Sequence, residues 1–246
     1  MTLSARFAAC AFVVLSSAQL CAAKPPKLTP AENKANMILR EVDATMKKHK
    51  TMTADFVLIQ NEKKTFRGDF ALRKPNLSRV VFRILKSPDF PEIRTMNDGK
   101  FNYWFPFPPI DTSTIYSKTV ASSNDGTLNL SSFALFLIRA FFDVNDAVRS
   151  EEMFAERNRS SKFKLVGERA WQNVSYSLLQ KDKLMSTAKG DLHCTTWLYI
   201  GNDNIVHRQI VRFYNRSANL KRTVNDLHEM QLSNIKTANV PDTAFQ

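Results

Sequence analysis

The chain has 246 residues, three cysteines and a formal net charge of +12, and 43% of its residues are hydrophobic. This length allows one large β domain or two small ones. In a cytoplasmic protein the charge would favour nucleic acid. The N-terminal sequence points to export instead, where anionic headgroups and other envelope components are the expected partners, so we expect no nucleic-acid partner. A charged surface that only keeps the protein dissolved is an equally good explanation.

The first 23 residues have the pattern of a cleaved secretory signal. Arg6 precedes an apolar run over residues 7–15, and small residues surround an expected cleavage site after about Ala23. The run is shorter than the ~20 residues that span a bilayer. A lipid-modified Cys21 is the alternative, but the small residue that such a site needs before the cysteine is absent.

Residues 24–246 are therefore expected to be the exported part of the chain and to form a single domain. Of the three cysteines only Cys194 remains in this part, so no internal disulfide can form. An exported protein with one thiol must derive its stability from an apolar core.

A helix is expected to begin after Thr29, because "TPAE" supplies a capping threonine, a proline at the first helical position and a glutamate that can reach back. Apolar residues then recur at three- and four-residue spacing and form one stripe. These residues are Ala35, Ile38, Leu39, Val42 and Met46.

From residue 52 the apolar period changes to two, which is typical of strands with one buried face. Strands are expected at "MTADFVLIQ", "KTFRGDFALRK", "SRVVFRI" and "FNYWF", and four further strand segments follow residue 162. "NDGK" (97–100) and "GNDN" (201–204) indicate hairpin turns. "SSFALFLIRAFFD" (131–143) is expected to be a helix on the sheet, because it is too short to cross a membrane. Together these segments predict an α+β, mainly antiparallel β fold that curls toward a barrel.

Three segments resemble the periplasmic outer-membrane lipoprotein carriers of the LolA-like family. They are "GDFALRKPNL" (68–77), the turn at 98–100 before an aromatic strand, and the end of the chain at 241–245. The resemblance spans most of the chain after the signal and is most specific in residues 52–105. It implies an unclosed β-barrel, a strongly curved antiparallel sheet with helices covering an apolar concave face.

The function that the resemblance implies is a periplasmic carrier. Such a protein shelters the acyl chains of a lipoprotein or lipid in a hydrophobic cavity, receives them from an inner-membrane donor transporter and hands them to an outer-membrane acceptor. We expect a monomer. Proteins of this fold also act as receptors and stress sensors, so the alternative is an envelope sensor or scaffold that engages a protein partner.

Two residues depart from the family pattern. Lys74 stands where the family commonly has an arginine; it keeps the charge but lacks the bidentate fork. Ser78 stands where well-studied members have an aromatic residue near the rim at which partners dock.

Apolar side chains on strand faces of consistent parity are expected to line the cavity for cargo. Lys74 shares the parity of Phe70 and Leu72 and is expected at the cavity mouth with Arg73, because a cation cannot lie deep without a partner. An ordinary core made of the same side chains is the alternative. The expected lining is Phe56, Leu58, Phe66, Phe70, Leu72, Val80, Phe82, Phe101, Tyr103, Phe105 and Phe136.

Motifs for catalysis are missing from the sequence. The four histidines are scattered without metal-ligand spacing, and no phosphate loop or nucleophile elbow occurs. We expect a protein that is not an enzyme, with no catalytic residues, no metal and no cofactor. A lipid hydrolase or transferase is a third, less favoured hypothesis.

Overall fold

A computed structural model describes residues 27–75, 77–85, 92–107, 117–120, 140–141, 162–187, 190–215, 225–238 and 240–245. Their elements, in chain order, are α1 (Pro30–Lys48), β1 (Thr51–Gln60), β2 (Lys63–Arg73), β3 (Leu77–Ile84), β4 (Glu92–Asp98), β5 (Phe101–Phe107), β6 (Ser117–Val120), β7 (Lys164–Trp171), β8 (Val174–Thr187), β9 (Gly190–Ile200), β10 (Val206–Tyr214), β11 (Asn225–Lys236) and the 3-10 helix η1 (Asp242–Phe245).

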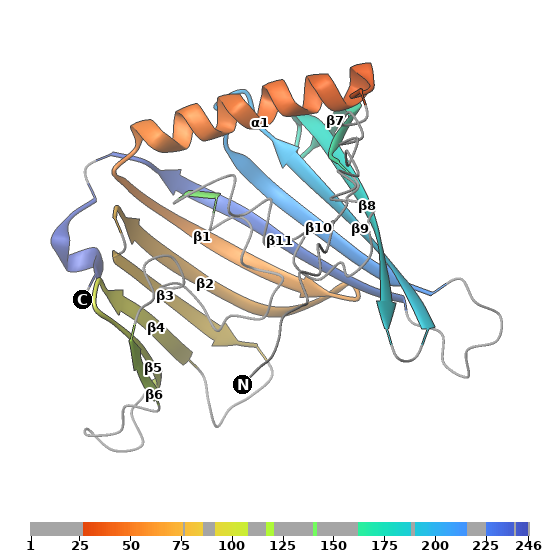
Figure 1. Ribbon diagram of the computed structural model, residues 1–246. Helices are drawn as coiled ribbons and strands as arrows, with labels where there is room; N and C mark the ends of the chain where they lie inside the picture. Colours follow the sequence, from red (N-terminus) through yellow and green to blue (C-terminus); the bar gives the residue numbers. More distant parts are fainter. Residues whose placement is uncertain are drawn as a thin grey trace, which may run out of the picture.

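The strands form one 11-stranded sheet in the order β6-β5-β4-β3-β2-β1-β11-β10-β9-β8-β7. Neighbouring strands are antiparallel, and β1 pairs with β11, so the first and last strands lie side by side within the sheet (Figure 1). The edge strands β6 and β7 do not pair with each other. The predicted unclosed, curved antiparallel barrel is confirmed.

Helix α1 begins where the sequence predicts it. The Thr29 side chain accepts a hydrogen bond from the backbone N–H of Glu32 at 3.2 Å, and Glu32 accepts one from the backbone N–H of Thr29 at 2.7 Å. The helix crosses one end of the sheet (Figure 1). Its predicted apolar stripe packs into the core or against it.

A second helical cover is described only in part. Of the helix predicted at residues 131–143, the described residues are Ala140 and Phe141, which are helical and buried. Both belong to the same core cluster as the α1 stripe.

The core cluster lies on one face of the sheet, which we call the concave face; the opposite face is the convex face. At its centre the Phe56 ring lies 6.5 Å from the ring of Phe70 and 6.0 Å from that of Phe82. Phe56 pairs across the strands with Gly68. A Cβ at Gly68 would stand 1.8 Å from the carbonyl oxygen of Val81 and 2.7 Å from Cζ of Phe56. The glycine is therefore required by close approach of the ring and of the neighbouring strand.

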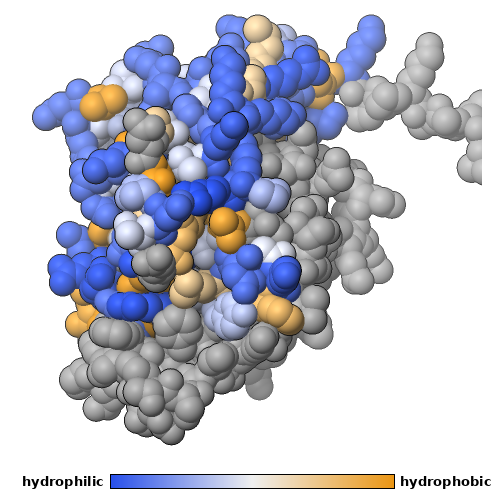
Figure 2. Space-filling model, turned by 90° about the vertical axis from the view of Figure 1, so that its left-hand side faces the viewer, coloured by the Kyte–Doolittle hydropathy of each residue, from blue (hydrophilic) through white to orange (hydrophobic). Residues whose placement is uncertain are grey.

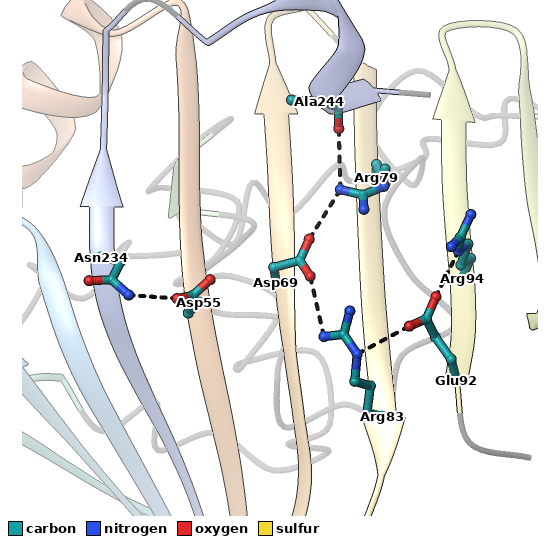
Figure 3. Close-up of polar contacts among 8 residues, drawn as sticks. All are labelled: Asp55, Asp69, Arg79, Arg83, Glu92, Arg94, Asn234 and Ala244. Carbon is teal, nitrogen blue, oxygen red and sulfur yellow. Dashed lines mark hydrogen bonds and ion pairs between the residues drawn. The ribbon is translucent and has the colours of Figure 1, made fainter.

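The convex face of β2–β4 is covered by ion pairs instead (Figure 3). Asp69 binds Arg79 at 3.0 Å and Arg83 at 3.5 Å, and Glu92 binds Arg83 at 3.1 Å and Arg94 at 2.8 Å. In the view of Figure 2 hydrophilic residues dominate the coloured surface, and hydrophobic ones are scattered among them.

We predict that Gly68→Ala lowers the free energy of unfolding by at least about 2 kcal/mol, because overpacking a closed site forces the backbone or the Phe56 ring to move. Urea denaturation measures the change. Lys64→Ala, at an exposed position of the same strand, is the control and should change stability by less than about 0.5 kcal/mol. Equal stability of Gly68→Ala and the unsubstituted protein would contradict this description of the core.

Candidate functional site

The register of the sheet decides which predicted cargo residues share a face, because residues paired across antiparallel strands point the same way. Phe56 pairs with Leu232 and Phe70 with Val80. The parity predicted for the first three strands is confirmed: one face carries Phe56, Leu58, Phe66, Phe70, Leu72, Val80 and Phe82.

Five of these side chains are closed core. Their exposed fractions are at most 6%, and they pack in one cluster with residues of α1 and with Phe141. They line neither the pocket near the turn between β1 and β2 nor the groove on the convex face. In this structure these five side chains therefore form an ordinary packed core, the alternative to a cargo cavity. They are Phe56, Phe70, Leu72, Val80 and Phe82.

The placement of Phe101 and Tyr103 in the cavity is wrong. Tyr103 pairs with Met96, which pairs with Arg79 on the convex face. The Tyr103 hydroxyl donates to Oδ2 of Asp98 at 2.9 Å, which raises the pKa of the phenol. The cause is the turn after Asp98: a two-residue loop fixes the register and sends the aromatic residues of β5 to the face of Asp98.

Two other members of the predicted lining are not described as side chains. The backbone of Phe105 pairs with Arg94, in the same convex register as Tyr103, and its side chain lies outside the described part. Phe136 lies outside the described residues altogether.

Lys74 lies at the C-terminal end of α1. Its ammonium donates to the carbonyl oxygen of Met46 and lies 4.9 Å from the centre of the Phe141 ring. Burial lowers the pKa of Lys74, the nearby Asp43 carboxylate opposes this shift, and Lys47 adds to it. The cation is thus on the side of the core, as its parity predicts, and is bound by a helix carbonyl and a ring.

Arg73 does not share the site of Lys74. Its guanidinium lies 2.7 Å from Oδ1 of Asp242 and 4.4 Å from the centre of the Phe245 ring, and it donates to the carbonyl oxygen of Val240 at 3.3 Å. It therefore holds the C-terminal segment against the convex face. Placing Arg73 at the cavity mouth is wrong, because successive residues of a strand point to opposite faces.

A pocket of about 300 Å³ opens near the turn between β1 and β2, at the other end of the sheet from Lys74. We call it the concave-face pocket and identify it by Leu58, Phe66, Gln209, Val211, His228 and Met230. Its lining also includes Ile59, Gln60, Thr65 and Glu229. Leu58 and Phe66 belong to the predicted lining. Gln209 is buried, and burial lowers the pKa of the His228 imidazole against the opposing charge of Asp226.

Five residues that line the pocket lie on β10 and β11 and are not part of the lining that the sequence predicts: Gln209, Val211, His228, Glu229 and Met230. Their signal was available, because Gln209 and Val211 alternate with Arg208 and Ile210 as in the earlier strands. The alternation does not show which strand lies next to β10 and β11. Only the pairing of Leu58 in β1 with Met230 in β11 brings these residues close to Leu58.

No metal centre can be assembled from the described residues: within them no three His, Cys, Asp or Glu side chains gather in a way that could hold an ion. The helical residues that the structure describes include no apolar stretch of membrane-spanning length.

No family model and no curated protein matches the chain. Similar solved structures include MucB (10% identity over 87% of this chain and 62% of that chain, TM-score 0.45) and LprF from Mycobacterium bovis (13% over 85% and 95%, TM-score 0.42). A LolA superfamily protein, NE2245 from Nitrosomonas europaea, is also similar (9% over 86% and 97%, TM-score 0.33). At these identities and scores the likeness concerns the fold alone and carries no conclusion about what this chain does.

Proposed function

We propose that this protein is an exported carrier that shelters an acyl chain of a lipid or lipoprotein and hands it to an outer-membrane acceptor. The observation that carries the proposal is the concave-face pocket. Leu58, Phe66, Val211 and Met230 give it an apolar lining on the sheltered face of an unclosed sheet. Its volume of about 300 Å³ is at the lower end of the range for ligand sites.

The pocket suits reversible binding of part of one chain. Burial of about eight methylenes would gain about 6 kcal/mol at roughly 0.8 kcal/mol each. Part of this gain offsets the freedom that protein and cargo lose on association. Transfer to a second protein needs such moderate affinity, because an acceptor must be able to compete for the cargo.

The polar side chains of the pocket support a cargo with a polar head. Gln209 and His228 lie among the apolar residues that define the pocket. An amide and an imidazole can both bind the carboxyl or ester group that ends an acyl chain. This arrangement supports an acyl ester or fatty acid over a plain hydrocarbon.

The signal-like N-terminus supports export. The resemblance of residues 52–105 to the LolA-like carriers supports transfer in the periplasm from an inner-membrane donor to an outer-membrane acceptor. The apolar concave face and the missing metal and catalytic motifs support binding without chemistry. A sensor or scaffold that binds a protein is the second candidate, and a groove on the convex face favours it independently.

We predict that Leu58→Trp, which places an indole in the concave-face pocket, weakens binding of a fluorescent fatty acid at least about tenfold. The thermal midpoint should change little, because the added ring enters existing space. Val57→Trp is the matched control: Val57 is the neighbouring residue of β1 on the convex face, and this change should leave affinity unaltered. Equal affinity of both variants would contradict the assignment of the pocket.

We also predict that His228 makes the folded state less stable in mild acid. Burial lowers the pKa of folded His228 below its ordinary value of 6.5, so the unfolded chain binds the proton more readily. The contribution of His228 to stability is therefore complete above pH 6.5 and is lost as the pH falls from there toward the folded pKa. Urea denaturation at pH 7.5 and 5.5 should show a smaller loss in His228→Gln than in the unsubstituted protein. The same loss in both would show that this imidazole is not sheltered.

A further inference from the structure

A second pocket lies on the convex face, on the side of the sheet away from the core. It has a volume of about 600 Å³ and is formed by β8–β11 together with the turn between β1 and β2. We call it the convex-face groove and define it by Trp197, Tyr199, Arg208, Ile210, Arg212 and Leu227. The acyl chain of the proposed carrier would lie on the other side of the sheet, so an occupant of this groove would be a separate ligand.

Apolar side chains in the groove meet water. Trp197, Tyr199, Ile210 and Leu227 are each only partly buried. Ile210 pairs with Trp197 in the sheet, which joins them into one surface. Such a surface differs from the convex face of β2–β4, where ion pairs cover the sheet (Figure 3). Half-exposed Trp and Tyr beside Arg are the residues enriched where proteins bind proteins.

Arg208 makes this surface rigid. Its Nε donates to Oε1 of Glu229 at 2.7 Å, and its guanidinium lies 4.8 Å from the centre of the Tyr199 ring and 5.2 Å from that of Trp171. Because Glu229 balances its charge, Arg208 orients the rings and does not itself attract an anion. The rings lose little freedom when a ligand binds to a surface held in this way.

Arg212 supplies the attraction for an anion. It is exposed, its Nε donates to Oδ1 of Asn225 at 2.9 Å, and its guanidinium lies 5.4 Å from the Tyr214 ring. Among the described residues no carboxylate forms an ion pair with Arg212. Its remaining N–H groups can bind a carboxylate in the forked geometry that arginine favours. Glu62 also lines the groove, and its carboxylate repels an anion. The acidic group of a ligand would therefore bind near Arg212.

We propose that the convex-face groove docks an extended segment of a partner protein in which an acidic side chain stands next to apolar ones. The apolar residues would cover Trp197, Tyr199 and Ile210, and the acidic residue would pair with Arg212. The net charge of +12 also speeds the approach of an acidic partner. A small anion would leave the aromatic surface uncovered, and a neutral glycan would leave Arg212 without a counter-charge.

Selection of a phage-displayed library of random dodecapeptides against the full protein tests the proposal. We expect enriched peptides to carry Asp or Glu within two positions of Leu, Ile or Phe. A fluorescein-labelled enriched peptide should bind Arg212→Gln about tenfold more weakly, the loss expected for one charge-assisted hydrogen bond. It should bind Glu62→Gln more tightly. Lys64→Gln, which removes an exposed cation near the turn without touching the groove, should bind as the unsubstituted protein does.

Three results would overturn the proposal. The first is a selection that enriches no peptide, or enriches peptides without acidic residues. The second is equal affinity for Arg212→Gln and Lys64→Gln, with circular dichroism confirming that both variants are folded. The third is displacement of the bound peptide by oleate, which would place the peptide in the concave-face pocket. The first two results do not bear on whether the concave-face pocket itself binds an acyl chain, so a failure of this proposal can be told from a failure of the proposed function.

Discussion

Contact between the ring of Phe56 and the bare backbone of Gly68 holds the concave face together. Because Gly68 has no Cβ, β3 can approach β2 closely. The rings of Phe56, Phe70 and Phe82 then fill the space above these strands. Because this part of the face is closed, any room for a ligand must lie elsewhere on it. The concave-face pocket accordingly lies toward the turn between β1 and β2, where Leu58 and Phe66 are only partly buried.

Much of the fold could be predicted because its signals are local. The cap at Thr29, the apolar stripe of α1, the Asp98–Gly99 turn and the alternation in β1–β3 each depend on residues within a few positions of one another. The mouth and the lining of the site could not be predicted as well. They depend on pairings across the sheet, such as that of β1 with β11, which no short segment contains.

The two errors have separate physical origins. Parity shows which residues of one strand share a face, but hairpin geometry decides which face of the sheet that is. Asp98 lies on the convex face, so the residues that follow its two-residue loop with the same parity, Phe101 and Tyr103, lie there too. Arg73 and Lys74 separate because successive residues point to opposite faces: the first holds the C-terminal segment and the second holds the end of α1.

The two faces of the sheet thus offer different chemistry: an apolar pocket inside, and an arginine–aromatic groove outside. The central claim is that acyl chains enter the inner pocket. The most direct test is photocrosslinking with a diazirine-labelled fatty acid, followed by mapping of the labelled peptides by mass spectrometry. We expect labels on Leu58, Phe66, Val211 or Met230. Labels confined to Trp197, Tyr199 or Ile210 of the convex face, or no saturable labelling at all, would contradict it.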